Sequence, residues 1–168
     1  PAMCIVGEPT AMAIATGHKG KTAIEAASVG STAHSALAPQ AVNAIHLACD
    51  LVAEIRHLQD DMVTSGAQDS AYDIPYTTLH AGLITSGVAL NIVPDHAVVT
   101  FEIRNLAADD PERILHRLRR AIAPVIAVAR KRATEADVVF KVINSYPGLE
   151  TSLDEAVVAM VAELTGSF

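Results

Sequence analysis

The sequence predicts an α+β protein with the element order β-α-β-β-α-β, a ferredoxin-like arrangement of one antiparallel sheet with two helices on one face. Residues 97–104 and 138–143 alternate between apolar and polar side chains, which is typical of half-buried strands. Residues 41–58 and 111–125 carry apolar side chains at helical spacing. A real core is also expected, because 51% of the 168 residues are hydrophobic and only 18% are charged.

The first half of the chain is predicted to hold strands, one helix and a loop. We expect a short buried strand over residues 2–6 and a strand or hairpin over 13–29 that breaks near residues 18–20. A helix over 41–58 follows. Its predicted buried positions are Val42, Ile45, Cys49, Val52 and Ile55. Residues 59–73 are small and polar, which predicts an exposed loop.

The second half is predicted to complete the sheet and the helical layer. Strands are expected over residues 77–84 and 97–104, the latter with Val99, Phe101 and Ile103 on one face. Asp110 and Pro111 are typical of a helix start, as N-cap and first helical residue. That helix should kink at Pro124, and its predicted inward positions are Leu115, Leu118, Ile122 and Val125. After the strand over 138–143, Ser152 and Glu155 predict a capping box for a terminal helix.

Charge and composition argue against several classes of partner. The net charge of −7 disfavours nucleic acids and anionic membrane surfaces, which attract clustered Lys and Arg. No apolar run approaches the roughly 20 residues that span a bilayer, and no signal-peptide pattern opens the chain. Cys4 and Cys49 lie in apolar contexts and form no C-x-x-C, so we expect reduced core cysteines and a cytoplasmic protein.

Four residues are candidates for chemistry, and the residue types alone leave each of them open. Glu8 follows an apolar stretch between Gly7 and Pro9, where it is either a solvated turn residue or a ligand. His34 lies among small residues and is either a surface histidine or an exposed catalytic group. Asn91 is a turn former or a substrate contact. Arg104 is an ion-pair partner or a bidentate carboxylate binder.

Several short motifs together resemble one enzyme family. They are Cys4-Ile5-Val6-Gly7-Glu8-Pro9-Thr10, His18-Lys19-Gly20, Gly30-Ser31-Thr32-Ala33-His34-Ser35, Leu90-Asn91-Ile92-Val93-Pro94, Ile74-Pro75-Tyr76-Thr77-Thr78-Leu79 and Tyr146-Pro147-Gly148-Leu149. In this order and spacing they resemble the acetylornithine deacetylase branch of the M20 family of zinc-dependent aminoacylases and peptidases. The resemblance covers essentially the whole chain, and the last two motifs favour the deacetylases over the desuccinylases.

The resemblance implies a role for each candidate residue. Glu8 matches a zinc ligand, and His34 matches a histidine that acts in trans, in the active site of the partner subunit. Asn91 matches a residue near the substrate, and Arg104 matches the group that holds the substrate's α-carboxylate. The resemblance therefore implies a homodimer that forms through the lid domain. Its implied substrate is a small N-acyl amino acid such as N2-acetylornithine, whose deacetylation is a reaction of arginine biosynthesis.

The resemblance also shows what this chain lacks. The family's other zinc ligands and its general base come from segments with no match here, because no His has an Asp two places on and no two Glu are adjacent. One or two zinc ions are thus expected only in a full-length enzyme, and the isolated chain is expected to be inactive. We expect a fragment in three parts: a catalytic-domain remnant over 1–12, a lid or dimerisation domain over 13–149, and the start of a returning catalytic-domain helix over 150–168.

Two alternatives stay open. Within the same chemistry, the substrate could be that of a succinyl-diaminopimelate desuccinylase or of a broad aminoacylase. From another class, a non-catalytic ferredoxin-like module that binds a ligand and dimerises would explain the β-α-β-β-α-β core. The Gly7-Glu8-Pro9-Thr10 segment favours the enzyme, because a free-standing module has no need of it.

Overall fold

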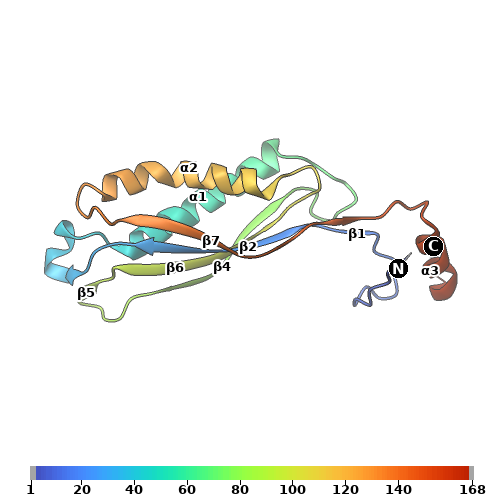
Figure 1. Cartoon of the computed structure of the whole chain (residues 1–168), viewed down its shortest axis with the longest axis horizontal. Helices are drawn as coiled ribbons and strands as arrows, with labels where there is room; N and C mark the ends of the chain where they lie inside the picture. Colours follow the sequence, from blue (N-terminus) through green and yellow to red (C-terminus); the bar gives the residue numbers. More distant parts are fainter. Residues whose placement is uncertain (1–2, 167–168) are drawn as a thin grey trace.

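The computed structural model describes residues 3–166, and its centre is a four-stranded sheet with two helices on one face (Figure 1). The sheet has the order β4-β6-β2-β7, and every neighbouring pair is antiparallel. In chain order its elements are β2 (Lys21–Val29), α1 (Ala44–Ser65), β4 (Thr78–Ser86), β6 (His96–Arg104), α2 (Pro111–Ala129) and β7 (Asp137–Tyr146). The predicted ferredoxin-like β-α-β-β-α-β fold is thereby confirmed.

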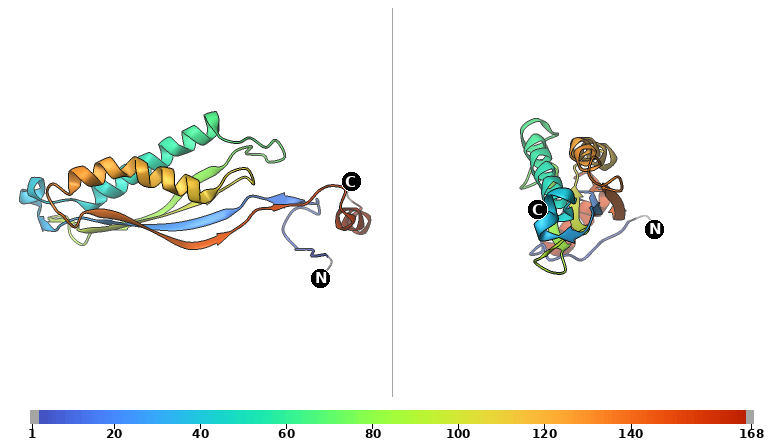
Figure 2. Two further views of the ribbon diagram at one scale, coloured as in Figure 1. Left: turned by 45° about the horizontal axis from the view of Figure 1, so that its top comes forward. Right: turned by 90° about the vertical axis from the view of Figure 1, so that its left-hand side faces the viewer.

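Short elements extend both ends of this sheet. At one end β3 (Ala33–His34) pairs with β5 (Ile92–Val93), and β3 leads into the 3₁₀ helix η1 (Ser35–Gln40). At the other end β1 (Gly17–His18) pairs with β8 (Leu149–Glu150). The terminal segments, including α3 (Ala156–Thr165), lie beyond this second pair, and both ends of the chain are found there (Figures 1 and 2).

The core lies between the sheet and the two helices. Alternate residues of β2 are buried, because successive side chains of a strand point to opposite faces. Val99, Phe101 and Ile103 of β6 are at most 2% exposed, as predicted, and Phe101 meets Phe140 of β7 edge to face. The opposite face of the sheet carries no helix, which leaves the alternate side chains of β2 and β6 half-buried (Figure 2).

Helix α1 begins later, ends later and buries a different face than the sequence predicts. Asn43 is its N-cap and accepts a hydrogen bond from the Ile45 amide, and the helix continues to Ser65 through part of the predicted loop. Its buried residues are Ala44, Leu47, Ala48, Leu51, Ile55, Leu58 and Met62. Of the predicted face within the helix only Ile55 is buried, and Cys49 is exposed. The true stripe is one of Leu and Ala at positions 47, 48 and 51, which the prediction passed over.

Helix α2 follows the sequence closely. Asp110 caps it by accepting a hydrogen bond from the Glu112 amide, and Pro111 opens it. Leu115, Leu118 and Ile122 are buried, and the helix runs through Pro124 to Ala129. Three of the four predicted inward positions are thereby confirmed, and the fourth, Val125, is only half-buried against the core.

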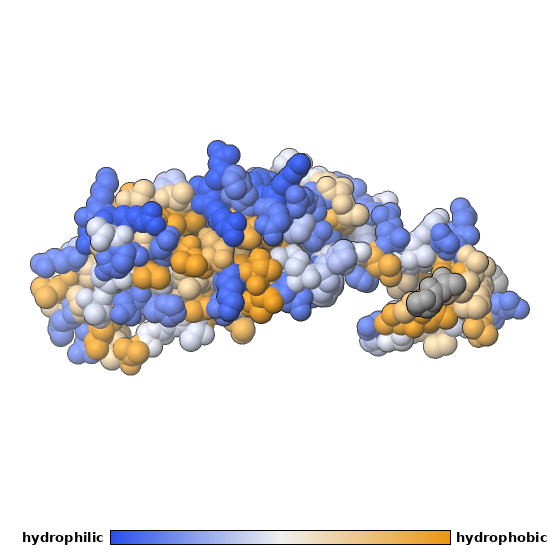
Figure 3. All heavy atoms as spheres, viewed as in Figure 1, coloured by the Kyte–Doolittle hydropathy of each residue, from blue (hydrophilic) through white to orange (hydrophobic). Residues whose placement is uncertain are grey.

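The terminal segments differ from the predictions. Residues 3–8 form no strand and are exposed, Cys4 included, and residue 2 lies outside the described residues. A strand needs a neighbour for its backbone groups, and no described segment pairs with this one. The capping box is also wrong, since α3 starts after Glu155 with no side-chain cap. Large apolar side chains are exposed here: Met3, Ile5, Val6, Met12, Leu153 and Leu164. In Figure 3, hydrophobic surface is visible on this terminal part of the molecule. Within residues 3–166, no helix has both the length and the apolar character needed to cross a bilayer.

Candidate functional site

Two of the predicted site residues, His34 and Asn91, meet at the β3–β5 end of the sheet. His34 stands opposite Ile92 in the strand pair, and the Ser35 amide donates a 2.9 Å hydrogen bond to the Asn91 carbonyl oxygen. The pairing of β3 with β5 brings them together, and Gly30 just before β3 lets the chain approach the start of α1, because a Cβ there would lie 2.1 Å from the Val42 carbonyl oxygen. Both side chains are exposed, so both can reach a ligand outside this chain.

The orientation of the His34 ring follows from one hydrogen bond. The Ala36 amide donates to His34 Nδ1 over 3.2 Å, which caps the first turn of η1. A nitrogen that accepts a hydrogen bond carries no proton, so the neutral ring holds its proton on Nε2. His34 Nε2 is therefore a hydrogen-bond donor, and it can donate to the oxygen of a carbonyl group or of an oxyanion.

Arg104 lies in a charged group on the open face of the sheet, at the β1–β8 end. Its Nε donates a 3.0 Å hydrogen bond to Glu102, and Lys21 lies 3.6 Å from the other oxygen of that carboxylate. Burial alone would raise the pKa of Glu102, but the bond and charge of Arg104 and the charge of Lys21 outweigh it and lower the pKa. Glu102 binds Nε rather than the terminal nitrogens, and its hydrogen bond and charge, with Tyr146 as a second partner, raise the pKa of Arg104.

Glu102 and Lys21 were missed by sequence reasoning. Glu102 and Arg104 are two residues apart on one strand, so alternation places both on the same face, and this signal was available. Lys21 joins through the pairing of β2 with β6, in which Ala23 stands opposite Glu102. No local pattern in the sequence reveals that pairing.

One chain does not bring the two halves of the predicted site together. His34 and Asn91 lie near the start of β6, because His34 pairs with Ile92 of β5 and β5 is followed after two residues by β6, whereas Arg104 ends that strand. Eight residue steps of about 3.3 Å separate His96 from Arg104, roughly 26 Å of strand. A small substrate cannot touch Arg104 and His34 of the same chain.

Among the described residues, Glu8 has no partner side chains with which to hold a metal. It is exposed on irregular backbone, and its carbonyl oxygen accepts the Thr10 amide. Within residues 3–166, no three side chains of His, Cys, Asp or Glu come together as metal ligands. Zinc needs three or four such ligands, so the described residues do not fit a zinc centre by themselves.

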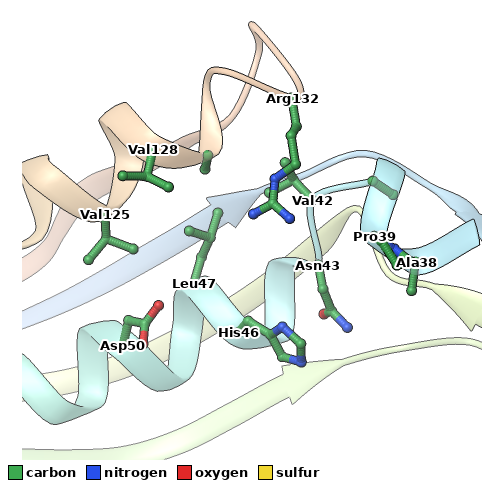
Figure 4. Close-up of a pocket in the computed structure, with 12 residues that line it drawn as sticks. Ala38, Pro39, Val42, Asn43, His46, Leu47, Asp50, Val125, Val128 and Arg132 are labelled. Atoms are coloured by element: carbon green, nitrogen blue, oxygen red, sulfur yellow. The ribbon is translucent and has the colours of Figure 1, made fainter.

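Two surface hollows lie away from His34. One is a groove between the start of α1 and the end of α2, where Leu47 and Val125 line the gap and Asp50 and Arg132 stand at its sides (Figure 4). The other adjoins the β1–β8 pair and includes Tyr72, Tyr146 and Glu150. Neither hollow includes a residue that the sequence singles out for chemistry.

A family model matches most of the sheet and both of its helices. The model describes a peptidase dimerisation domain of the M20 type, and it matches residues 16–128. The matched range contains His34, Asn91 and Arg104, and it leaves out Glu8.

Curated relatives match the sequence more widely. A probable carboxypeptidase of Arthroderma gypseum (strain ATCC MYA-4604 / CBS 118893) is 37% identical over 130 residues, which cover 77% of this chain and 28% of the relative. An acetylornithine deacetylase of Salmonella heidelberg (strain SL476) is 30% identical over 167 residues, which cover 99% of this chain and 42% of the relative. The chain thus spans less than half the length of these curated relatives.

Solved structures share the fold. A tripeptidase from Staphylococcus aureus subsp. aureus mu50 superposes with a TM-score of 0.57 at 26% identity, covering 90% of this chain and 36% of that one. An aminopeptidase from Bacillus cereus ATCC 10987 gives a TM-score of 0.60 at 24% identity, with 90% and 37% covered.

Proposed function

The chain belongs to the M20 family of peptidase dimerisation domains, and from that premise we propose that it is the lid of a dimeric amidohydrolase whose active site is shared between two subunits. The observation that carries the proposal is the roughly 26 Å of strand from Arg104 to His96, because the His34–Asn91 pair lies at the His96 end of β6. A second copy can supply the missing half of the site. The substrate class we propose is a small N-acyl amino acid, with N2-acetylornithine favoured.

The free edge of β4 is the surface we propose for the second copy. Strand β4 contains no Asp, Glu, Lys or Arg, whereas the opposite edge strand β7 carries Asp137 and Lys141. Charged residues, especially Lys, protect a sheet edge from pairing, so β7 is guarded and β4 is not. Leu83 and Ile84 of β4 are 68% and 54% exposed, which supplies apolar area for such an interface.

A two-fold axis at β4 would bring the two half-sites together. Thr78 of β4 pairs with Arg104, and Ser86 at the other end of β4 pairs with Ala97. If two β4 strands pair antiparallel about Gly82, Thr78 of one copy stands opposite Ser86 of the other. Arg104 of one copy then lies at the same end of the joined sheet as His34 and Asn91 of its partner.

Each residue has a chemical role in this arrangement. The terminal nitrogens of Arg104 bind the substrate's α-carboxylate, because a guanidinium offers paired donors in the plane of a carboxylate. His34 Nε2 donates to the carbonyl oxygen of the scissile amide and stabilises the negative charge that grows there. The Asn91 side chain supplies a second neutral donor or orients the acyl group.

The metal is a separate part of the proposal. We keep Glu8 as one ligand of a zinc centre whose remaining ligands, and whose general base, come from segments outside residues 1–168. Large apolar side chains are exposed in residues 3–16 and in α3. Exposed apolar patches commonly mark a surface that another protein segment covers, which supports a contact with such further structure. A cytoplasmic location likewise remains a prediction.

A second candidate substrate class comes from the relatives. The 37% identical relative is a probable carboxypeptidase, and a peptide also ends in a free α-carboxylate that Arg104 can hold. Within N-acyl amino acids, N-succinyl-diaminopimelate remains the competing substrate. The non-catalytic module remains the alternative of another class.

The test is kcat/KM of a protein that carries this chain with the flanking segments of its relatives, supplied with zinc. The substrates are N2-acetylornithine, N-succinyl-diaminopimelate and a dipeptide. We expect acetylornithine to be preferred and His34→Ala to lower kcat by about 100-fold or more, the usual cost of losing one oxyanion donor. If N-succinyl-diaminopimelate or the dipeptide is hydrolysed with the higher kcat/KM, that compound replaces acetylornithine as the proposed substrate. Absence of all three activities would favour the non-catalytic module.

A further inference from the structure

The chain leaves the main sheet through one narrow ribbon, the β1–β8 pair. Gly17 stands opposite Glu150 and His18 opposite Leu149, and the Thr151 amide donates a 2.8 Å bond to the Thr16 carbonyl oxygen. Both terminal segments lie beyond these few residues (Figure 1). The contacts that fix the orientation of the β1–β8 pair therefore also fix the direction in which the two terminal segments leave the domain.

The loop over residues 66–77, which follows α1, is joined to this ribbon by Lys19. The Lys19 ammonium donates to the carbonyl oxygens of Ile74 and Tyr76 over 2.7 and 2.5 Å. It also lies 5.5 Å from the centre of the Tyr72 ring. One side chain thus contacts three residues of the loop from a position directly after β1.

The loop is built to present those two carbonyl groups. The Asp69 amide donates a 2.7 Å bond to the Pro75 carbonyl oxygen, and the Ala71 amide donates to the Asp69 carboxylate over 2.9 Å. These bonds close the loop on itself, and the first of them holds Pro75, which stands between the two residues whose carbonyl oxygens Lys19 binds. A hydrogen bond from a charged ammonium to a backbone carbonyl stabilises the structure more than a hydrogen bond from a neutral donor.

A second contact brings the same loop against the ribbon. A Cβ at Gly17 would lie 3.2 Å from the Tyr72 hydroxyl and 2.9 Å from the Leu149 carbonyl oxygen. The absence of a side chain at Gly17 therefore allows Tyr72 and β8 to close on it from two sides. Burial in this contact lowers the pKa of Lys19, although the nearby Asp69 carboxylate acts in the opposite direction.

We propose that Lys19 is a latch that couples loop 66–77 to the β1–β8 ribbon, so that loop and ribbon open together and the ribbon's direction depends on the loop. The latch is a conformational device of the fold and does not depend on the proposed reaction. Its geometry is long-range, because Lys19 lies 55 residues from Ile74 in the sequence. Lys19 makes no contact with Glu102, so the latch is also distinct from the charged group around Arg104.

Hydrogen exchange of residues 1–168 tests the latch directly. The variants are Lys19→Met, which keeps the stem but removes charge and donors, and Lys19→Arg, which keeps both. The matched control is Lys21→Met, which removes a lysine two residues away that binds Glu102 instead. The reporters are the Asp69 amide in the loop, the Thr151 amide at the ribbon and the β2 and β6 amides in the core.

In Lys19→Met we expect the Asp69 and Thr151 amides to exchange at least about tenfold faster, because two bonds from a charged donor are lost, while core amides keep their protection. Lys19→Arg should restore most of that protection, and Lys21→Met should leave both reporters unchanged. Faster exchange in the loop without the ribbon would overturn the coupling. Equal acceleration in the core would show a general loss of stability and would overturn the latch as well.

Discussion

A pair of inactive subunits should restore activity to one another if the active site is shared as proposed. The perturbation is His34→Ala in one subunit and Arg104→Ala in the other, within the longer dimeric protein, with a different affinity tag on each. Each homodimer carries a defect in both sites. A mixed dimer has one site with both defects and one site with neither.

The expected magnitude follows from where the two residues lie. Since His34 lies at the His96 end of β6 and roughly 26 Å of strand separates His96 from Arg104, each site takes His34 from one subunit and Arg104 from the other. Mixed dimers, purified through both tags, should have about half the kcat of the wild-type dimer, because a two-fold dimer has two equivalent sites. The KM of the restored site should equal that of the wild type.

The matched control pairs His34→Ala with Asn91→Ala. These residues are neighbours across the Ser35–Asn91 hydrogen bond, so one subunit supplies both to the same site. Every site of this mixed dimer lacks one of them, and the activity should stay at the level of the homodimers. Restoration in the control, or its absence in the first pair, would refute the argument from the strand distance.

Three further outcomes are expected. Ser28→Ala should raise the free energy of unfolding by about 1 kcal/mol in urea titrations, because the fully buried Ser28 hydroxyl has no hydrogen-bond partner among the described residues. Leu83→Lys should shift sedimentation from dimer to monomer, since a lysine on the β4 edge opposes pairing, and an unchanged dimer would move the interface elsewhere. The lowered pKa of Glu102 means that its contribution to stability is present above the unfolded pKa, near 4.5, and is lost as the pH falls through the folded value. Stability measured against pH should therefore fall less steeply in Glu102→Gln.

The element order could be predicted because local signals agreed with it. Strand β6 alternates between apolar and polar residues, and the cap at Asp110 opens α2 where expected. The first helix was harder. Two overlapping faces of this helix are apolar in the sequence: one contains Leu47, Ala48 and Leu51, and the other runs through Cys49. Only packing against the sheet determines which of the two faces is buried.

The structure shows where the candidate site residues lie, and their chemical roles stay predictions. The small residues around His34 favour an exposed position and the residues around Asn91 favour a turn, and the structure brings these two together across β3 and β5. The ion pair of Arg104 with Glu102 follows from strand alternation, but the distance from Arg104 to His34 depends on the length and pairing of β6. The contact of Lys19 with Ile74 leaves no local trace, because it joins segments 55 residues apart.

The uncharged edge of β4 has a consequence for handling the protein. An unguarded edge strand can pair with any exposed strand, including that of a misfolded neighbour. If its own second copy is the cover, the single subunit is the species at risk, and mass action makes that species rarer as the protein becomes more concentrated. Dilution, which usually protects proteins from aggregating, would then expose the unpaired β4 edge by favouring the monomer. Storage at high concentration would keep this edge covered in the dimer.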